Sequence, residues 1–168
     1  MPLPIRPATA ADVPALHALI ERAYRGETAR AGWTHEADYL TGPRTDAAAL
    51  TALIADPAQT MLLMHESDRL VACVGLTDKG GGLVYLGLFA VDPAGQAQGV
   101  GRTVLAAAED HARANGATRI EMTVVDRRAT LIAWYERRGY ALTGETRPFP
   151  VALLEGTPLA FVVLAKPL

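Results

Sequence analysis

The segment from Val84 to Ala108, VYLGLFAVDPAGQAQGVGRTVLAAA, constrains the fold more than any other part of this sequence. Residues 84–91 are apolar throughout, which is typical of a strand buried on both faces. Asp92-Pro93 ends this strand. From about Gly99 onward, apolar residues recur every four positions, which is typical of an amphipathic helix. The segment therefore predicts a buried strand, a loop and a helix in direct succession.

The loop between this strand and this helix has the character of a phosphate site. It reads Gln96, Ala97, Gln98, Gly99, Val100 and Gly101. Glycines at a helix start let a ligand approach the backbone, and the first amides of a helix lie unpaired at the positive end of its dipole. The third glycine of the dinucleotide-binding fingerprint and the lysine of a Walker loop are both absent. The loop predicts a pyrophosphate site of another kind.

The composition excludes several classes of protein. Half of the 168 residues are hydrophobic, so we expect one globular domain spanning 1–168. Sixteen basic residues against eighteen acidic ones give a formal net charge of −2 without a basic tract, so no nucleic-acid partner is predicted. The sequence has no apolar run of about 18 residues and no apolar signal core, so we expect a cytoplasmic protein without membrane contact.

Few side chains are suited to a metal site or a covalent intermediate. The four histidines are scattered without ligand spacing, so no metal is predicted. Cys73 is the single cysteine and lies in an apolar run, where we expect a buried thiol and no internal disulfide. A reactive thiol needs exposure, and the single serine, Ser67, lies in a predicted turn. Neither residue is predicted to act as a nucleophile.

The order of the remaining elements predicts an α/β fold. The first half is rich in hairpins, and the second half alternates strands with helices, so we expect a mixed sheet with helices on both faces. The expected strands cover residues 5–7, 60–65, 69–77, 84–91, 119–125, 140–146 and 159–165. The expected helices cover about 9–25, 45–55, 99–115 and 128–138.

Several motifs together resemble the GNAT superfamily of N-acetyltransferases. The loop at 96–101 is similar to the family motif Gln/Arg-x-x-Gly-x-Gly/Ala, LFAVDP at 88–93 resembles its pantetheine-binding strand, and LIAWYERRGY at 131–140 resembles its "LYEKLGF" segment. The opening IRPATAADVPAL and the order of the elements are similar as well. The resemblance implies a largely antiparallel sheet of about seven strands and a single acetyltransferase domain.

The resemblance also implies that acetyl-CoA is the co-substrate and that no metal takes part. In the family, the strand splays from its neighbour at a bulge, and its free backbone groups pair with pantetheine, while the glycine loop holds the pyrophosphate. The implied cofactor contacts are Phe89, Ala90, Val91, Gln96, Ala97, Gln98, Gly99, Val100, Gly101 and Arg102. Arg128 is a further candidate. The helix dipole disfavours a cation at a helix start, so an arginine in that position favours a contact with a ligand.

Two residues are candidates for the chemistry. By the resemblance, Tyr135 protonates the leaving thiolate; the alternative is a core aromatic residue. Glu121 is a candidate base, because burying a carboxylate inside an apolar strand costs free energy unless the carboxylate is paired, so its presence there indicates a role. A structural salt bridge is the alternative role for Glu121, and a water held near Thr123 is the alternative base. Many family members have Asn where this chain has Arg128, and several have Glu where it has Thr123.

The acceptor is expected to bind between residues 25–45 and 147–156, where the family builds its acceptor pocket. Glu27, Trp33 and Glu36 are the candidate contacts, and they fit a small amine or a protein N-terminus. The resemblance predicts direct acetyl transfer from acetyl-CoA to a primary amine and leaves room for a homodimer. The alternative is a non-catalytic acyl-CoA-binding regulatory domain on the same fold.

Overall fold

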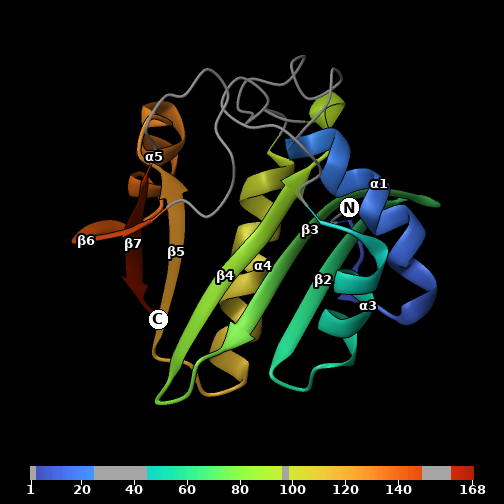
Figure 1. Ribbon diagram of the computed structural model, residues 1–168, viewed down its shortest axis with the longest axis horizontal. Helices are drawn as coiled ribbons and strands as arrows, with labels where there is room; N and C mark the ends of the chain where they lie inside the picture. Colours follow the sequence, from blue (N-terminus) through green and yellow to red (C-terminus); the bar gives the residue numbers. More distant parts are fainter. Residues whose placement is uncertain (1–2, 25–44, 96–98, 149–159) are drawn as a thin grey trace.

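The computed structural model describes residues 3–24, 45–95, 99–148 and 160–168. These residues fold into a seven-stranded sheet with helices on both faces (Figure 1). The strand order is β1-β2-β3-β4-β5-β7-β6. The strands are β1 (Ile5–Pro7), β2 (Gln59–Glu66), β3 (Arg69–Asp78), β4 (Leu83–Val91), β5 (Arg119–Val125), β6 (Ala141–Pro148) and β7 (Ala160–Pro167). The helices are α1 (Val13–Tyr24), α3 (Ala47–Ala55), α4 (Val100–Ala114) and α5 (Ala129–Glu136).

The pairing of the strands confirms the predicted mixed, largely antiparallel sheet. Five of the neighbouring pairs are antiparallel, and β4 pairs with β5 in parallel. Helix α4 connects these two parallel strands, as a parallel connection requires. The strand predicted at 119–125 has the observed bounds, whereas the helix predicted at 128–138 is shorter at both ends, as α5.

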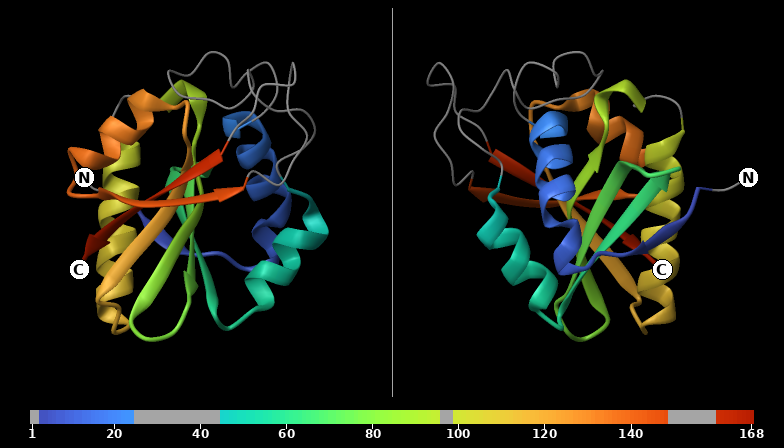
Figure 2. Two further views of the ribbon diagram at one scale, coloured as in Figure 1. Left: turned by 60° about the vertical axis from the view of Figure 1, so that its left-hand side comes forward. Right: turned by 90° about the vertical axis from the view of Figure 1, so that its right-hand side faces the viewer.

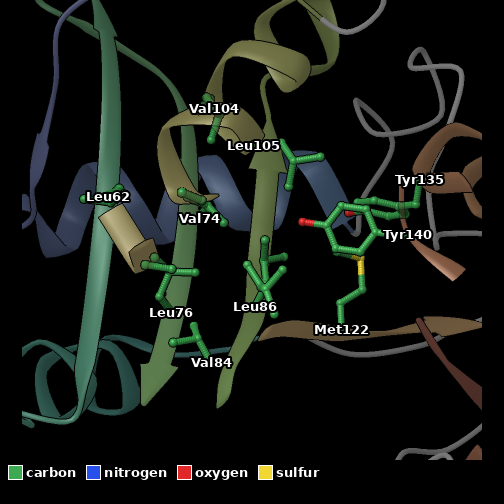
Figure 3. Packing of buried hydrophobic residues seen from close by; sticks show 14 of the residues in the cluster. Leu62, Val74, Leu76, Val84, Leu86, Val104, Leu105, Met122, Tyr135 and Tyr140 are labelled. Atoms are coloured by element: carbon green, nitrogen blue, oxygen red, sulfur yellow. The ribbon is translucent and has the colours of Figure 1, made fainter. Parts of the chain in front are cut away.

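The two faces of the sheet carry two separate hydrophobic cores. Helices α1 and α3 lie on one face and α4 on the other, as the right-hand view of Figure 2 shows. Leu16 and Leu19 of α1 and Leu50 of α3 belong to one core, together with Leu63 of β2 and Cys73 of β3. On the opposite face, Figure 3 shows Val104 and Leu105 of α4 beside Val74 and Leu86 of the sheet. The burial of Cys73, which has no exposed surface, confirms that prediction.

Strands β4 and β5 pair over a short distance and then separate. Their parallel ladder joins Leu83–Leu86 to residues 119–122 and ends there, and Figure 1 shows the two strands diverging beyond it. Strand β4 was predicted to be buried on both faces. The prediction holds for Val84, Leu86, Ala90 and Val91, but Tyr85 and residues 87–89 are half-buried. Residues 87–89 lie beyond the ladder with β5, so this side of β4 has no neighbouring strand there.

A β-bulge lies in β4 at the level of this separation. In the pairing of β4 with β3, Ala90 faces Cys73, and Gly87 faces Gly75, so β4 has one extra residue between the two pairs. Leu88 at the bulge has a positive φ of 46°, which is unusual for a branched side chain. A bulge bends its strand and breaks the regular ladder, so it redirects backbone groups at this point of the sheet.

Candidate functional site

A pocket opens where β4 and β5 separate. Apart from Arg128, the described side chains around it are uncharged, and they come from α1, β4, β5, α5 and β7. They are Tyr24, Tyr85, Leu86, Gly87, Leu88, Phe89, Met122, Thr123, Val124, Val125, Arg128, Leu131, Tyr135 and Phe161. The β5 side of β4 has no strand partner beyond Leu86, so its backbone is available to a ligand that enters the gap.

The bulged part of β4 is held in place from the other side. The Cys73 thiol donates a hydrogen bond to the Leu88 carbonyl at 3.3 Å, and the Tyr24 hydroxyl donates to the Phe89 carbonyl. Burial raises the pKa of the Cys73 thiol to about 12, so this group stays protonated at neutral pH and keeps its donor role. These two bonds hold the backbone carbonyls of Leu88 and Phe89 at the bulge.

The start of α4 has the geometry of an anion site. Gly99 is the N-cap residue and has a φ of 83°, a left-handed conformation that favours glycine. The Thr103 amide donates to the Gly99 carbonyl at 3.2 Å, so the amides of residues 100–102 precede the first intrahelical bond. Gly101 has Phe89 and Trp134 within 4 Å of the place where a side chain would begin. Gln96, Ala97 and Gln98 lie outside the described residues.

Guanidinium groups gather beside this helix start. The Arg138 guanidinium lies 3.8 Å from the centre of the Trp134 ring and donates to the Trp134 carbonyl at 2.8 Å. Burial lowers the pKa of Arg138, and the positive charges of Arg137 and Arg102 lower it further. Arg138 Nε is buried without a hydrogen-bond partner within the part of the chain that the structure describes. The cluster supplies the positive potential that a polyphosphate needs.

Tyr135 lies in the wall of the pocket, with 6% of its surface exposed. Its ring packs edge-on against Trp134, Phe89 and Tyr140, with centroids 5.0, 6.5 and 5.6 Å away. No described residue forms a hydrogen bond with its hydroxyl. Burial raises its pKa, Tyr24 raises it further, and the positive charge of Arg128 opposes these effects. The Tyr135 phenol is thus neutral at physiological pH and lies in the lining of the pocket.

A pair of hydroxyl groups joins β4 and β5 where the strands begin to separate. The Tyr85 hydroxyl and Thr123 Oγ1 lie 2.7 Å apart, and both residues line the pocket. Sequence reasoning identified Thr123 but missed Tyr85 and Tyr24. A tyrosine within an otherwise aliphatic strand was the available signal for Tyr85, because a buried hydroxyl needs a partner. Tyr24 gave no signal beyond its place at the end of a helical stripe.

Glu121 is held in an ion pair next to the pocket and not in its lining. Its carboxylate accepts a hydrogen bond from Arg147 Nη2 at 3.2 Å, and Arg147 also contacts Glu145. Glu121 is buried, and it shares a face of β5 with Thr123, as alternation along a strand requires. This pair matches the salt bridge that the sequence offered as the alternative to a base. Arg128, the N-cap residue of α5, does line the pocket.

The sequence comparison decides the family. Residues 14–140 match the Acetyltransferase (GNAT) family. This chain belongs to that family. Glu27, Trp33 and Glu36 of the GNAT domain, the predicted acceptor contacts, lie outside the described residues. A comparison of the sequence with curated proteins gives no match.

Solved GNAT structures share the whole fold. The ribosomal-protein-S18-alanine N-acetyltransferase of Escherichia coli superposes with a TM-score of 0.76 at 19% identity, covering 98% of this chain and 92% of that one. The ribosomal-protein-alanine N-acetyltransferase of Brucella melitensis gives 0.76 at 21% identity over 99% and 100%. The yncA protein of Salmonella typhimurium, solved with its cofactor acetyl-CoA, gives 0.75 at 19% over 99% and 94%.

Two further features bear on the classes of function considered above. Among the described helices, none is long and apolar enough to cross a membrane. Within the same residues, no three His, Cys, Asp or Glu side chains are grouped as metal ligands would be.

Proposed function

We propose that this GNAT protein transfers the acetyl group of acetyl-CoA to a primary amine by direct attack in a ternary complex. The observation that carries the proposal is the buried Tyr135 side chain, which lines the pocket beside the β4 bulge and whose hydroxyl has no hydrogen-bond partner among the described residues. A thioester in that gap would have the Tyr135 phenol on one side and the backbone of β4 on the other. We further propose that residues 1–168 act as one cytoplasmic domain.

We propose that acetyl-CoA lies along β4 and extends to the start of α4. Pantetheine is an extended chain with amide groups, and β4 at Phe89, Ala90 and Val91 lies beyond the end of the ladder with β5, where an extended ligand can run beside it. The pyrophosphate would lie at the start of α4, on the amides of residues 99–102 and the loop before them. Arg102, with Arg138 beside it, adds positive charge for the phosphates. Arg128 contributes a cation at the thioester end of the pocket.

The reaction forms one C–N bond and breaks one C–S bond. The neutral amine attacks the thioester carbonyl, and backbone amides of the bulged strand stabilise the oxyanion that develops. Collapse of the tetrahedral intermediate expels the CoA thiolate, whose reference pKa is about 8.5. Tyr135 donates its proton to that sulfur and recovers one from water. Most of the acceleration comes from holding the two substrates together.

A water bound by Tyr85 and Thr123 takes the proton that the amine loses. These two hydroxyl groups lie 2.7 Å apart in the pocket and can accept and donate in sequence. Glu121 precedes Thr123 by two residues on the same strand face, so its carboxylate stabilises the positive charge of the protonated water through a second water. Its ion pair with Arg147 holds this carboxylate in place. The carboxylate therefore acts on the proton through water.

The pocket also favours direct transfer over an acetyl-enzyme intermediate. Cys73 is fully buried, its pKa is raised to about 12, and its thiol is engaged with Leu88. A thiol in this state is a poor nucleophile. Among the described lining residues, none is a cysteine or a serine. This lining supports attack by the amine on the thioester carbonyl itself.

The acceptor is a small amine or a protein N-terminus. We propose Glu27, Trp33 and Glu36 as its contacts, because Tyr24, the last described residue before that segment, lines the pocket. The names of the neighbours from Escherichia coli and Brucella melitensis favour a protein N-terminus. The absence of the family's glutamate at Thr123 favours a small amine. A homodimer is compatible with either acceptor.

The experiment that tests the proposal measures CoA release with a panel of amino acids, polyamines, amino sugars and peptides. We expect turnover on at least one acceptor, together with saturable acetyl-CoA binding in calorimetry. Tight acetyl-CoA binding without turnover on any member would favour the alternative, a regulatory acyl-CoA-binding domain. One observation keeps that alternative open: the described lining of the pocket contains no carboxylate.

A further inference from the structure

A buried carboxylate in the middle of α4 joins parts of the molecule that the sheet connects only weakly. Glu109 has 7% of its surface exposed. Both of its oxygens accept from Lys166 Nζ at 3.0 Å, and Oε1 also accepts from the Tyr140 hydroxyl at 3.1 Å. Lys166 belongs to β7, and Tyr140 lies between α5 and β6. We call these three residues the Glu109 clamp.

The clamp spans the two halves of the split sheet. Helix α4 packs on β3 and β4, whereas Lys166 and Tyr140 belong to the half that contains β5, β7 and α5. The backbone ladder between the halves covers only four residue pairs of β4 and β5, against seven between β5 and β7. The clamp therefore adds a polar attachment to the apolar contacts between the halves, on the face that carries α4.

The clamp reaches Tyr135 through Tyr140. The two rings pack edge-on with centroids 5.6 Å apart, and Figure 3 shows them side by side next to Leu105 of α4. The Tyr140 amide also donates to the Tyr135 carbonyl at 3.2 Å. Phe89 of β4 contacts the Tyr135 ring from the other half. The separation of the halves thus decides where the Tyr135 hydroxyl lies relative to a thioester on β4.

The chemistry of the clamp indicates a role in positioning. Replacing a buried ion pair with apolar side chains is often neutral or stabilising, so such a pair is weak evidence for stability alone. Here both oxygens of Glu109 bind Lys166, and the glycine at position 139 leaves space for the lysine side chain. A side chain at Gly139 would begin 3.2 Å from Lys166 Cε, and Gly139 has a φ of 95°. Ion pairs and hydrogen bonds fix direction and distance, which apolar contacts do not.

We propose that Glu109 is a positioning residue, which sets the distance between the α4 and α5 halves and so places Tyr135 for proton donation to the CoA sulfur. This inference rests on the proposed function for its catalytic part. Its geometric part, the fixed separation of α4 and α5, is independent of any activity. Two measurements address the two parts.

The first measurement is a double-mutant cycle of Glu109→Gln with Tyr135→Phe. Because a misplacement of about 1 Å can cost on the order of 10²-fold, we expect Glu109→Gln to lower kcat by roughly 10–10²-fold. We expect acetyl-CoA affinity within about twofold of wild type, and little further loss of kcat from Glu109→Gln in the Tyr135→Phe background. Full additivity of the two losses, or an unchanged kcat in Glu109→Gln, would overturn the proposal.

The matched control is Asp12→Asn, which breaks another ion pair. Asp12 bonds Arg6 at 2.7 Å at the start of α1, away from α4 and α5. The Asp12→Asn variant should have an unchanged kcat, even if its melting temperature is lower than that of the wild type. If Glu109→Gln fails to fold, Tyr140→Phe replaces it, because this variant removes one bond to Glu109 and keeps the ion pair. The same cycle with Tyr135→Phe should again be non-additive.

The second measurement records the distance between the halves directly. Spin labels on Ala106→Cys of α4 and Glu136→Cys of α5, both exposed, report it by pulsed electron resonance, and buried Cys73 does not compete for the label. We expect a narrow distance distribution that shifts or broadens with Glu109→Gln. An unchanged distribution would overturn the positioning role. A wild-type protein without turnover would instead contradict the proposed function, and the distance result would still decide the geometric part.

Discussion

The Tyr135 hydroxyl is the single group on which the proposed chemistry depends most. Tyr135→Phe removes one oxygen and little volume, and that oxygen has no protein partner among the described residues, so the free energy of unfolding should change by less than about 1 kcal/mol. Turnover should fall by roughly 10²–10⁴, the usual contribution of a positioned acid. Acetyl-CoA affinity should stay nearly constant. Steady-state kinetics, calorimetry and urea denaturation check the three expectations, and a near-normal kcat would show that water protonates the thiolate.

The raised pKa of Tyr135 gives a second prediction at this scale. In the unfolded chain the phenol ionises at about pH 10, whereas burial keeps it protonated to higher pH in the folded protein. The folded state then binds more protons than the unfolded state above about pH 10, so the free energy of unfolding falls as pH rises there. Urea denaturation between pH 8 and 11 should show this fall, and Tyr135→Phe should reduce its slope. A slope unchanged by Tyr135→Phe would contradict the burial of an intact phenol.

At the scale of elements, the N-terminus of α4 should govern the binding of the phosphates. Gly101→Glu places a negative charge in the first helical turn, where the dipole favours it, so the helix should persist. The same charge opposes the pyrophosphate, and we expect acetyl-CoA affinity to fall by at least about tenfold. Gly101→Gln is the matched control for size, and it should lose less affinity. Calorimetry on both folded variants checks the difference, and equal losses would mean that bulk and not charge is responsible.

At the scale of the whole molecule, acetyl-CoA should join the two halves of the sheet. A ligand that binds only the folded state stabilises it by about 2.7 kcal/mol at a hundred times its Kd. For a domain of this size we expect the melting temperature to rise by roughly 5–10 °C. Differential scanning fluorimetry checks the rise, and Gly101→Glu should lose most of it at the same concentration. A rise of equal size in both proteins would place the cofactor away from α4.

The sequence by itself determined the elements and the family, because these depend on local patterns. The apolar run of β4, the glycine at the left-handed N-cap of α4 and the strand at 119–125 could all be read from neighbouring residues. The motif around Tyr135 likewise identified the candidate acid before any coordinates. Such features can be recognised in the sequence, because a strand, a helix cap or a motif extends over a few consecutive residues.

Only the tertiary structure decided which side chains meet. Glu121 and Arg147 are 26 positions apart, Tyr85 and Thr123 are 38 apart, and Lys166 and Glu109 are 57 apart. Each pairing depends on strand register and on the separation of β4 from β5. A shift of one residue in register would turn these side chains to the other face. The candidate acid was therefore readable from the chain, whereas its hydroxyl partners, the state of Glu121 and the Glu109 clamp follow from how the strands align.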